Sequence, residues 1–374
     1  MTESVSWLRA MDPRDTKLNI LLIAVPATAY FNYVDHNYSM AFFSSLVAIM
    51  PLAFLMGRAT EEIALRTSES LGGLLNATFG NAAELIIAIL LILQASNAVD
   101  VETQTFYIHL VQASLIGSIL GNLLLVMGLA FVWGGIHHSE QRYSETQVSS
   151  NGSLLLLSMI VLVIPTVFHS TVGGGVGDSR VQDLSHIAAV ILLMMYGLFL
   201  LFQFRTHVHL FATDGTHNEN PEMTQRDSVI LLVVATIMVS WMAEVLVHSV
   251  ESAAADFGLS HLFIGVILLP LFGNAAEHFT AVSVAAKNKM DLSFAISMGS
   301  STQIAVFVAP LMVVFAWVVG VPLTFEFGML ETVSAFLAVM IVNSTAADGK
   351  SNWLEGAMLL SAYAVLGAAF LFHP

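Results

Sequence analysis

The sequence predicts an all-α, polytopic membrane protein with eleven transmembrane helices: one extra N-terminal helix followed by two inverted five-helix repeats. Three observations support this fold class. Hydrophobic residues make up 56% of the 374 residues and charged residues only 10%, whereas an average soluble domain has about 25% charged residues. Apolar runs long enough to cross a bilayer recur along the whole chain. One five-residue segment also occurs twice, in two such runs.

The apolar runs, taken in order, define the predicted helices. They cover residues 18–34, 40–57, 72–95, 106–133, 151–169, 184–205, 228–255, 259–286, 291–319, 325–346 and 353–373. Ala27-Thr28-Ala29 resembles a signal cleavage site, but we interpret the first run as an uncleaved helix because its flanking charges fit the remaining topology. The longest polar connection, 206–227, separates the repeats. The predicted parts are therefore 1–39 with the first helix, 40–205, the loop 206–227, and 228–374.

Basic residues test this map. Of 12 Lys and Arg residues, eleven fall on the side of the N-terminus and only Arg180 falls on the other side. A missing or invented span would switch the side of every later loop and destroy this split. The positive-inside rule then places the N-terminus and the 206–227 loop in the cytoplasm and the C-terminus outside. We expect a multi-pass protein of the plasma (inner) membrane of a prokaryote.

Composition also excludes several functions. The chain has no cysteine, which rules out disulfides, thiolate metal sites and thiol catalysis. A net charge of −15 argues against nucleic-acid binding and favours attraction of cations. We expect no cofactor.

The duplicated segment is Gly-Asn-Ala-Ala-Glu, at residues 80–84 and 273–277. A carboxylate inside a membrane is costly and marks a functional site by default. Glu84 lies in the third predicted span and Glu277 in the eighth. Five spans is an odd number, so the two copies enter the membrane with opposite polarity, and inverted repeats place the substrate site near the midplane.

Polar residues around each copy suggest an oxygen-rich site. Gly117-Ser118 and Gly299-Ser300 follow the two glutamates in related contexts. We predict that Asn81 and Glu84 lie one turn apart on one face of the third span, and that Pro270 and Gly273 loosen the second helix ahead of its acid. Carboxylates, amides and hydroxyls in this number suit Ca²⁺. The predicted ligands are Glu84, Glu277, Asn81, Asn274, Ser118, Ser300 and Gln303, with Gln112, Asn122, Ser301 and Glu244 as secondary candidates.

The competing interpretation is that these polar residues have a purely structural role. Stripes of small residues are usually packing faces, and a lone Asn or Gln in a span usually bridges helices. However, no Lys or Arg lies at the centre of a span to pair with the two acids. The duplication and the uncompensated charges together favour a functional site.

Other acids fit less clearly. Glu244 and Glu251 share one face of the seventh span, and Glu244 has either an ion-pathway role or a structural one. Glu331, in the tenth span, is similar but nearer a helix end. The acids Glu61, Glu62 and Glu69 are predicted to form the solvated face of a cytoplasmic connection.

With these motifs, the sequence resembles the calcium/cation antiporter superfamily, and more narrowly its cation/proton exchanger branch. The resemblance rests on the two Gly-Asn-Ala-Ala-Glu copies, on 112–122 and on 299–305, and it extends over nearly the whole chain. It implies a transporter, not an enzyme, that exchanges Ca²⁺ for H⁺ by alternating access and exports Ca²⁺ from the cytoplasm. It also implies that Glu84 and Glu277 bind Ca²⁺ and take up protons, with the other predicted ligands lining the site.

Two alternatives stay open. The first is an exchanger of the same fold that uses Na⁺ as counter-ion or carries another divalent cation such as Mn²⁺. The second, more remote, is an intramembrane metalloenzyme, although the chain lacks His-Glu-x-x-His. The 206–227 loop holds no dense acidic run, so we expect a connector rather than a calcium-regulatory element. The partners we expect are Ca²⁺, H⁺ and the lipid bilayer; stoichiometry, affinity and oligomeric state do not follow from the sequence.

Overall fold

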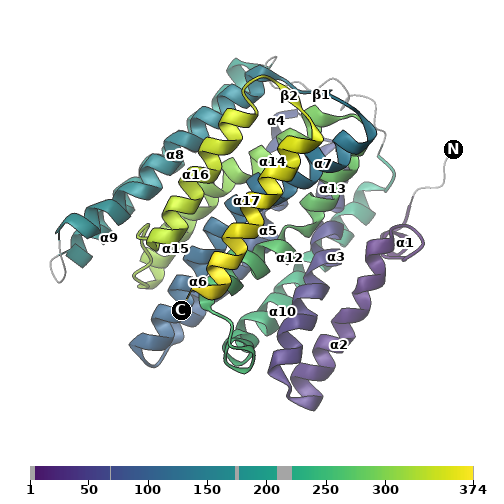
Figure 1. The fold of residues 1–374 in the computed structure, drawn as a ribbon. Coiled ribbons are helices and arrows are strands. Elements are labelled where there is room, and N and C mark those ends of the chain that lie inside the picture. The colour runs from purple at the N-terminus through teal and green to yellow at the C-terminus, as the bar shows by residue number, and fades with distance from the viewer. Residues whose placement is uncertain (1–4, 68, 173–176, 209–220, 374) are drawn as a thin grey trace. The chain divides into compact units, whose positions relative to one another are not determined.

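The computed structural model describes residues 5–67, 69–172, 177–208 and 221–373, and these residues are mostly helical (Figure 1). Eight of the described helices are long and apolar enough to cross a membrane, and a pair bent by 58° supplies a ninth. The protein is therefore an all-helical, multi-pass membrane protein. The eight are Lys17–Asp35, Tyr38–Ala64, Val101–His137, Glu145–Thr171, Ser179–Thr206, Gln225–Phe257, Met290–Val319 and Trp353–Phe372, and the bent pair is His261–Gly273 with Ala275–Ala286.

Every predicted span coincides with a helix or a pair of helices. Two of these helices, however, are short. Helix α5 (Ala82–Asn97) has 16 residues and α16 (Met329–Thr345) has 17, whereas an untilted crossing needs about 20. The count of eleven crossings therefore stays a prediction. Most of the helices also extend several residues beyond the apolar runs that predicted them.

The chain divides into two compact units. The first consists of Met1–Leu90, Thr213–Leu259 and Leu271–Glu277, and the second of Leu91–Ala212, Ser260–Pro270 and His278–Pro374. Each unit therefore combines segments from both predicted repeats.

The first unit is built around two long helices that run side by side, α3 (Tyr38–Ala64) and α10 (Gln225–Phe257) (Figure 1). Buried apolar side chains of both helices, such as Leu46 and Met242, form its core. Between helices in a lipid environment, this close packing supplies much of the association energy. The other elements are α1 (Trp7–Ala10), the 3₁₀ helix η1 (Lys17–Ile23), α2 (Ala24–Tyr30), the π-helix η2 (Phe31–Asp35), α4 (Glu69–Gly80) and the first part of α5.

At the C-terminal end of α3, one acid that was predicted to be solvated is buried. Glu62 is only 6% exposed, and its carboxylate accepts hydrogen bonds from the backbone N–H groups of Glu222 (2.9 Å) and Met223 (3.2 Å). Arg66 pairs with Glu62 at 3.1 Å and donates to the carbonyl of Met223. The prediction of a solvated face is wrong for Glu62, which anchors the segment that leads into α10.

The other two acids of that group differ from Glu62. Glu61 is exposed, as predicted, and the side chain of Glu69 lies outside the described residues. The middle of the 206–227 loop, 209–220, also lies outside them, with Asp214 and Glu219, so its role as a connector stays a prediction.

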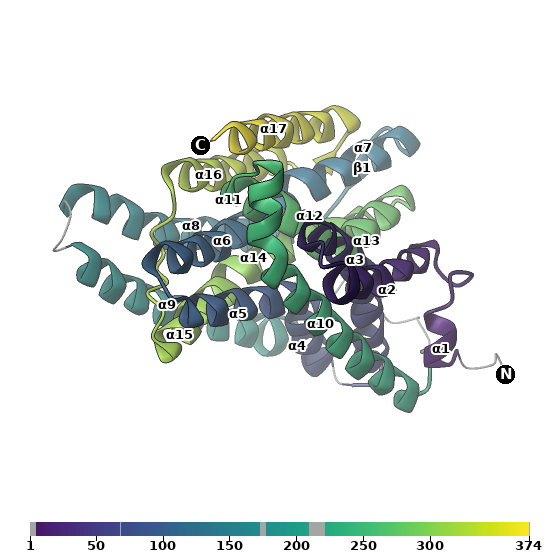
Figure 2. The ribbon, with the colours of Figure 1, turned by 90° about the horizontal axis from the view of Figure 1, so that it is seen from below.

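The second unit contains most of the remaining helices. Helices α6, η3 and α7 form one continuous rod, and α14, η8 and α15 form another. Figure 2 shows α17 beside α7 and α16. The elements are α6 (Val101–Leu120), η3 (Gly121–Val126), α7 (Met127–His137), α8 (Glu145–Val172), α9 (Gly177–Leu201), η4 (Phe202–Thr206), α11 (His261–Phe263), η7 (Ile264–Leu268), α14 (Met290–Gln303), η8 (Ile304–Val308), α15 (Ala309–Val319), α16 and α17 (Trp353–Phe372). Helices α12 (Leu269–Gly273) and α13 (Ala275–Ala286) each contribute to both units.

Glycines let helices of the second unit approach closely. A Cβ atom on Gly135 would overlap the backbone of Trp353, and one on Gly356 would overlap the backbone of Val132. Such contacts, where no side chain separates the helices, are typical of membrane bundles. They hold α17 against α7.

One short sheet joins two connections of the second unit. Strand β1 (Gln141–Arg142) pairs antiparallel with β2 (Lys350–Ser351), with Gln141 opposite Ser351. The buried amide of Gln141 also donates to the carbonyl of Ala285 at 2.8 Å. This end of the unit is therefore tied together by backbone and side-chain hydrogen bonds.

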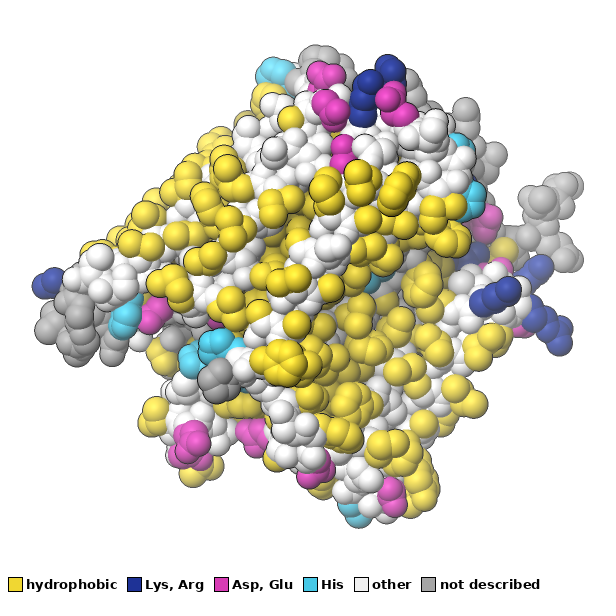
Figure 3. All heavy atoms as spheres, in the orientation of Figure 1, with side chains coloured by type: hydrophobic (Ala, Val, Ile, Leu, Met, Phe, Trp, Pro, Cys, Tyr) yellow, Lys and Arg dark blue, Asp and Glu magenta, His cyan; other side chains and the backbone are white. Residues whose placement is uncertain are grey.

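The surface matches a membrane environment. Apolar side chains cover the flanks of the helices, and Lys, Arg, Asp and Glu gather toward their ends (Figure 3). Exposed apolar residues are stable in this pattern only where lipid covers them.

Candidate functional site

Both copies of Gly-Asn-Ala-Ala-Glu interrupt a helix at the asparagine. Helix α4 ends at Gly80 and α5 begins at Ala82; α12 ends at Gly273 and α13 begins at Ala275. The predicted span 72–95 is therefore divided at Asn81 into two helices. Asparagine competes poorly in helix interiors but favours the position before a helix, and the carbonyl of Asn81 accepts from the N–H of Leu85 at 3.0 Å. The predicted loosening ahead of the second acid is confirmed by the 58° bend.

The break gives each glutamate a defined electrostatic position. Glu84 and Glu277 are both the third residue of the helix that follows the break, in its first turn. The N-terminal end of a helix carries partial positive charge and stabilises a carboxylate. The end of the preceding helix leaves backbone carbonyls without helical partners. Each motif therefore places an anionic and several neutral oxygen donors at one helix junction.

Within the first unit, the two motifs meet. A Cβ atom built on Gly80 would lie 3.6 Å from Oε1 of Glu277. Asn81 and Asn274 are both buried. Among the described residues, Oε1 of Glu84 and both amide atoms of Asn274 are buried without a hydrogen-bond partner. Buried polar atoms are usually satisfied, so these atoms are available for a ligand.

The second unit contains other residues that were predicted to line the Ca²⁺ site. Asn122 is fully buried, and its amide N–H donates to the hydroxyl of Ser300 at 3.0 Å. Its carbonyl oxygen Oδ1 has no hydrogen-bond partner in the part of the chain that is described. Ser118 is also buried, and Gln303 is half-buried. Asn122 is only a secondary candidate in the sequence analysis. In the structure it contacts Ser300 and is as well placed as Ser300 to bind an ion.

The structure also reveals two π-helical turns that the sequence reasoning missed. Segment η3 begins at Gly121, four residues after Gly117, and η8 begins at Ile304, five residues after Gly299. π-Helical turns loosen the regular hydrogen-bond ladder and are frequent at functional sites. The Gly-Ser pair that precedes each segment was the available signal, since it marked corresponding positions in both repeats.

Three secondary candidates have other roles or positions. The amide of Gln112 donates to the carbonyls of Thr324 and Glu326, at 2.9 Å each, so it clamps the segment before α16. The hydroxyl of Ser301 donates to the carbonyl of Ser297 in its own helix. Glu244 is exposed on α10. The structure therefore does not gather these three with the other candidates.

Glu331 has a structural role as well. Its carboxylate accepts from the N–H of Gly328 at 2.8 Å and caps the start of α16. Its position near a helix end was predicted, but the cap depends on the turn that precedes the helix.

The chemistry of the first unit's set is that of a hard-cation site. No group of three or more His, Cys, Asp or Glu side chains among the described residues could hold a metal ion. The donors are instead two carboxylates with neutral amide and backbone oxygens. Such a set binds Ca²⁺, and each carboxylate can alternatively hold a proton.

Comparisons with known proteins agree with this chemistry. The family model for sodium/calcium exchanger proteins matches residues 38–205 and 227–372. A Ca²⁺/H⁺ antiporter of Aphanothece halophytica is 42% identical over 95% of this chain and 96% of its own length. One of Synechocystis is 42% identical over 95% and 97%. The solved structure of native YfkE matches with a TM-score of 0.80 and 36% identity, covering 95% of this chain and all of YfkE. A solved H⁺/Ca²⁺ exchanger, CAX, shares the fold with a TM-score of 0.73, at 12% identity and over 96% and 93% of the two chains.

Proposed function

Because the chain belongs to the sodium/calcium exchanger protein family, we propose that it is a Ca²⁺/H⁺ antiporter in which Glu84 and Glu277 carry both ions in turn. Its 42%-identical relatives are named as Ca²⁺/H⁺ antiporters and match it along nearly their full lengths. The protein exchanges Ca²⁺ for H⁺ across a membrane and is a transporter, not an enzyme.

The observation that carries the site assignment is the meeting of the two repeated motifs. The backbone of Gly80 in the first copy faces the carboxylate of Glu277 in the second. The buried oxygens of Glu84 and Asn274 that have no hydrogen-bond partner among the described residues lie on the same two motifs. Two carboxylates neutralise one divalent ion, and neutral oxygens complete its coordination. We include Ser118, Asn122, Ser300 and Gln303 in the proposal as further neutral ligands of the transported ion.

Exchange follows from the competition of the two ions for the same oxygens. Ca²⁺ requires deprotonated carboxylates, so binding of the metal releases protons and binding of protons releases the metal. Either loading neutralises the buried charge, whereas the empty, fully ionised pair is costly in the membrane. The site therefore switches from one side of the membrane to the other more readily when it holds Ca²⁺ or protons. This requirement couples the two fluxes.

The topology belongs to the proposal as well. Eleven crossings, with the N-terminus in the cytoplasm and the C-terminus outside, account for the distribution of Lys and Arg. They also give the inverted repeats on which alternating access depends. A reporter after Pro374 should lie outside, and a tag near Asn218 should lie in the cytoplasm. Two termini on the same side would refute both the count and the inversion.

Flux measurements test the transport cycle. In proteoliposomes with an imposed pH gradient, we expect ⁴⁵Ca²⁺ to move against the proton flux, and a Na⁺ gradient alone to drive no uptake. In a prokaryotic inner membrane the proton gradient would then export Ca²⁺ from the cytoplasm. Uptake that follows the Na⁺ gradient and ignores pH would replace H⁺ by Na⁺ as the counter-ion. If Mn²⁺ competed more strongly than Ca²⁺ for transport, Mn²⁺ would replace Ca²⁺ as the proposed substrate.

A further inference from the structure

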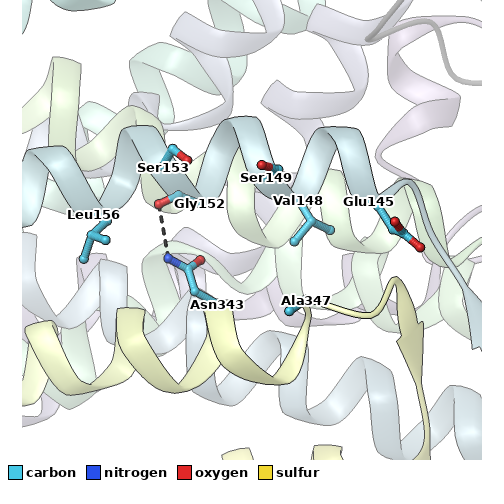
Figure 4. A pocket seen from close by; sticks show the side chains of 8 residues that line it. All are labelled: Glu145, Val148, Ser149, Gly152, Ser153, Leu156, Asn343 and Ala347. Carbon is cyan, nitrogen blue, oxygen red and sulfur yellow. Dashed lines mark hydrogen bonds between the residues drawn. The ribbon is translucent and has the colours of Figure 1, made fainter.

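A separate groove lies between α8 and α16, far along the chain from the two repeated motifs. Its volume is about 270 Å³. Residues of α8 line one wall, and Asn343 of α16 and Ala347, just after the end of α16, line the other (Figure 4). Both helices belong to the second unit. The groove contains none of the residues proposed to bind the transported ion.

The polar atoms of this groove are mainly hydrogen-bond acceptors. Glu145, the first residue of α8, contributes a carboxylate, and Ser149 and Ser153 contribute hydroxyls. The amide of Asn343 donates to the carbonyl of Gly152 at 3.2 Å, while its own oxygen Oδ1 is buried without a partner in the described residues. The lining includes no Lys, Arg or His.

The carboxylate of Glu145 is not neutralised by any basic side chain in the part of the chain that the structure describes. Two nearby basic side chains, Arg142 and Lys350, both pair with Glu140, at 3.2 and 3.4 Å. Among the described residues, Glu145 has no ion-pair partner. Glu145 is exposed, so a ligand that brings positive charge and N–H donors can reach its carboxylate and complement the groove.

The groove is amphiphilic along its length. Leu156 lies eleven residues after Glu145, which is about 16 Å along the helix. The outer faces of the two helices are apolar, with Ile160 50% and Leu337 51% exposed, and lipid covers such faces. The polar end lies near β1, where charged side chains gather. A ligand that fits both ends has a polar head at the membrane surface and a hydrocarbon chain in the bilayer.

We propose that this groove binds a membrane lipid with a primary-amine headgroup, of the phosphatidylethanolamine class. Its ammonium group donates hydrogen bonds to Glu145 and to neutral oxygens of the groove, and an acyl chain extends past Leu156. A choline headgroup has the same charge but no N–H donor. A glycerol headgroup leaves only the negative phosphate, which Glu145 repels.

Binding to the purified, full-length protein in detergent micelles tests the proposal. Native mass spectrometry would be titrated with phosphatidylethanolamine, phosphatidylcholine and phosphatidylglycerol of identical acyl chains. We expect the ethanolamine lipid to bind about tenfold more tightly than either of the others. Glu145→Gln should remove that preference, because it keeps the side-chain size and removes the charge. Glu251→Gln should preserve it, since Glu251 is an exposed carboxylate of α10 in the first unit and does not line the groove.

A second variant and a second ligand keep the test decisive. Ala347→Trp fills the groove without changing any charge, and should weaken binding of the ethanolamine lipid about tenfold even if Glu145→Gln fails to fold. Glycerophosphoethanolamine, which has the headgroup without chains, should bind at least tenfold more weakly than the lipid. Equal binding of the chain-free headgroup would identify a site for soluble amines and overturn the lipid assignment. Unchanged lipid preference in folded Glu145→Gln, or unchanged affinity in Ala347→Trp, would overturn the groove as the site.

Discussion

The two internal repeats share their ligand chemistry but not their packing. Both copies of Gly-Asn-Ala-Ala-Glu break a helix at the asparagine. The glycines that precede Ser118 and Ser300 differ: a Cβ atom on Gly117 would overlap the backbone of Val266, whereas one on Gly299 would meet nothing within 4 Å. The break depends on the local sequence, which is duplicated, and the packing depends on the neighbour, which is not. The first repeat therefore uses its glycine for close helix contact, and the second leaves room beside its own.

The residue after each motif differs as well. Leu85 follows the first glutamate and His278 follows the second. His278 is buried, and its Nε2 atom has no hydrogen-bond partner among the described residues. The second copy therefore carries a polar ring that the first replaces by an apolar side chain. Four experiments separate what the copies share from what distinguishes them.

The largest effect is expected at the shared glutamates. Glu84→Gln and Glu277→Gln each keep the side-chain size but remove one negative charge and one proton carrier. In a weakly screened site we expect each to lower coupled ⁴⁵Ca²⁺ flux more than about 100-fold, while the exposed control Glu61→Gln stays near wild type. Equilibrium Ca²⁺ binding by the unmodified protein should weaken as the pH falls, because protons occupy the same oxygens. Robust coupled flux in both variants would exclude the glutamates, and pH-independent binding would exclude the shared-carboxylate mechanism.

The two asparagines should show a smaller, parallel loss. Asn81→Ala and Asn274→Ala each remove one neutral oxygen at a helix break, and we expect Ca²⁺ affinity by isothermal titration to fall about tenfold. Ser301→Ala is the matched control, because its hydroxyl already bonds to the carbonyl of Ser297. A loss in only one asparagine variant would show that the copies are not equivalent ligands. No loss of affinity in either variant would mean that both asparagines serve only to interrupt the helix.

Replacing Gly117 or Gly299 by alanine should change the stability of the protein to different extents. Gly117→Ala forces its helix away from the backbone of Val266, and we expect a cost of about 1–3 kcal/mol. Gly299→Ala has open space and a helical backbone, so its thermal unfolding midpoint in detergent should stay within a few degrees of wild type or rise. Equal destabilisation by the two changes would contradict the packing asymmetry.

The smallest effect is expected at His278. His278→Leu makes the second copy resemble the first and replaces a buried ring nitrogen that has no partner. Removing an unsatisfied polar group is neutral or stabilising, by about 1 kcal/mol. We expect flux within about twofold of wild type, because the glutamates alone are proposed to carry the protons. A tenfold loss of flux with unchanged folding would instead place the imidazole in the proton path.

The amino-acid sequence by itself determined the membrane class, the positions of the helices and the duplicated acids. These features are local: hydropathy is a sum over neighbouring residues, so an apolar run such as 291–319 marks its helix, observed at 290–319, without knowledge of the rest. The repeated motif needed only two identical strings. The opposite polarity of the two copies and the number of crossings rest on the same kind of pattern and stay predictions.

Tertiary structure alone decided which polar atoms found partners. Glu62 looked like a surface acid because its neighbours in sequence are charged, yet backbone N–H groups about 160 residues away bury it. Gln112 looked like a ligand, but carbonyls more than 200 residues away occupy its amide. In Asn274, by contrast, both amide atoms lack a hydrogen-bond partner within the described part of the chain. A hydrogen bond depends on the positions of two groups in space, and sequence patterns give only one of the two.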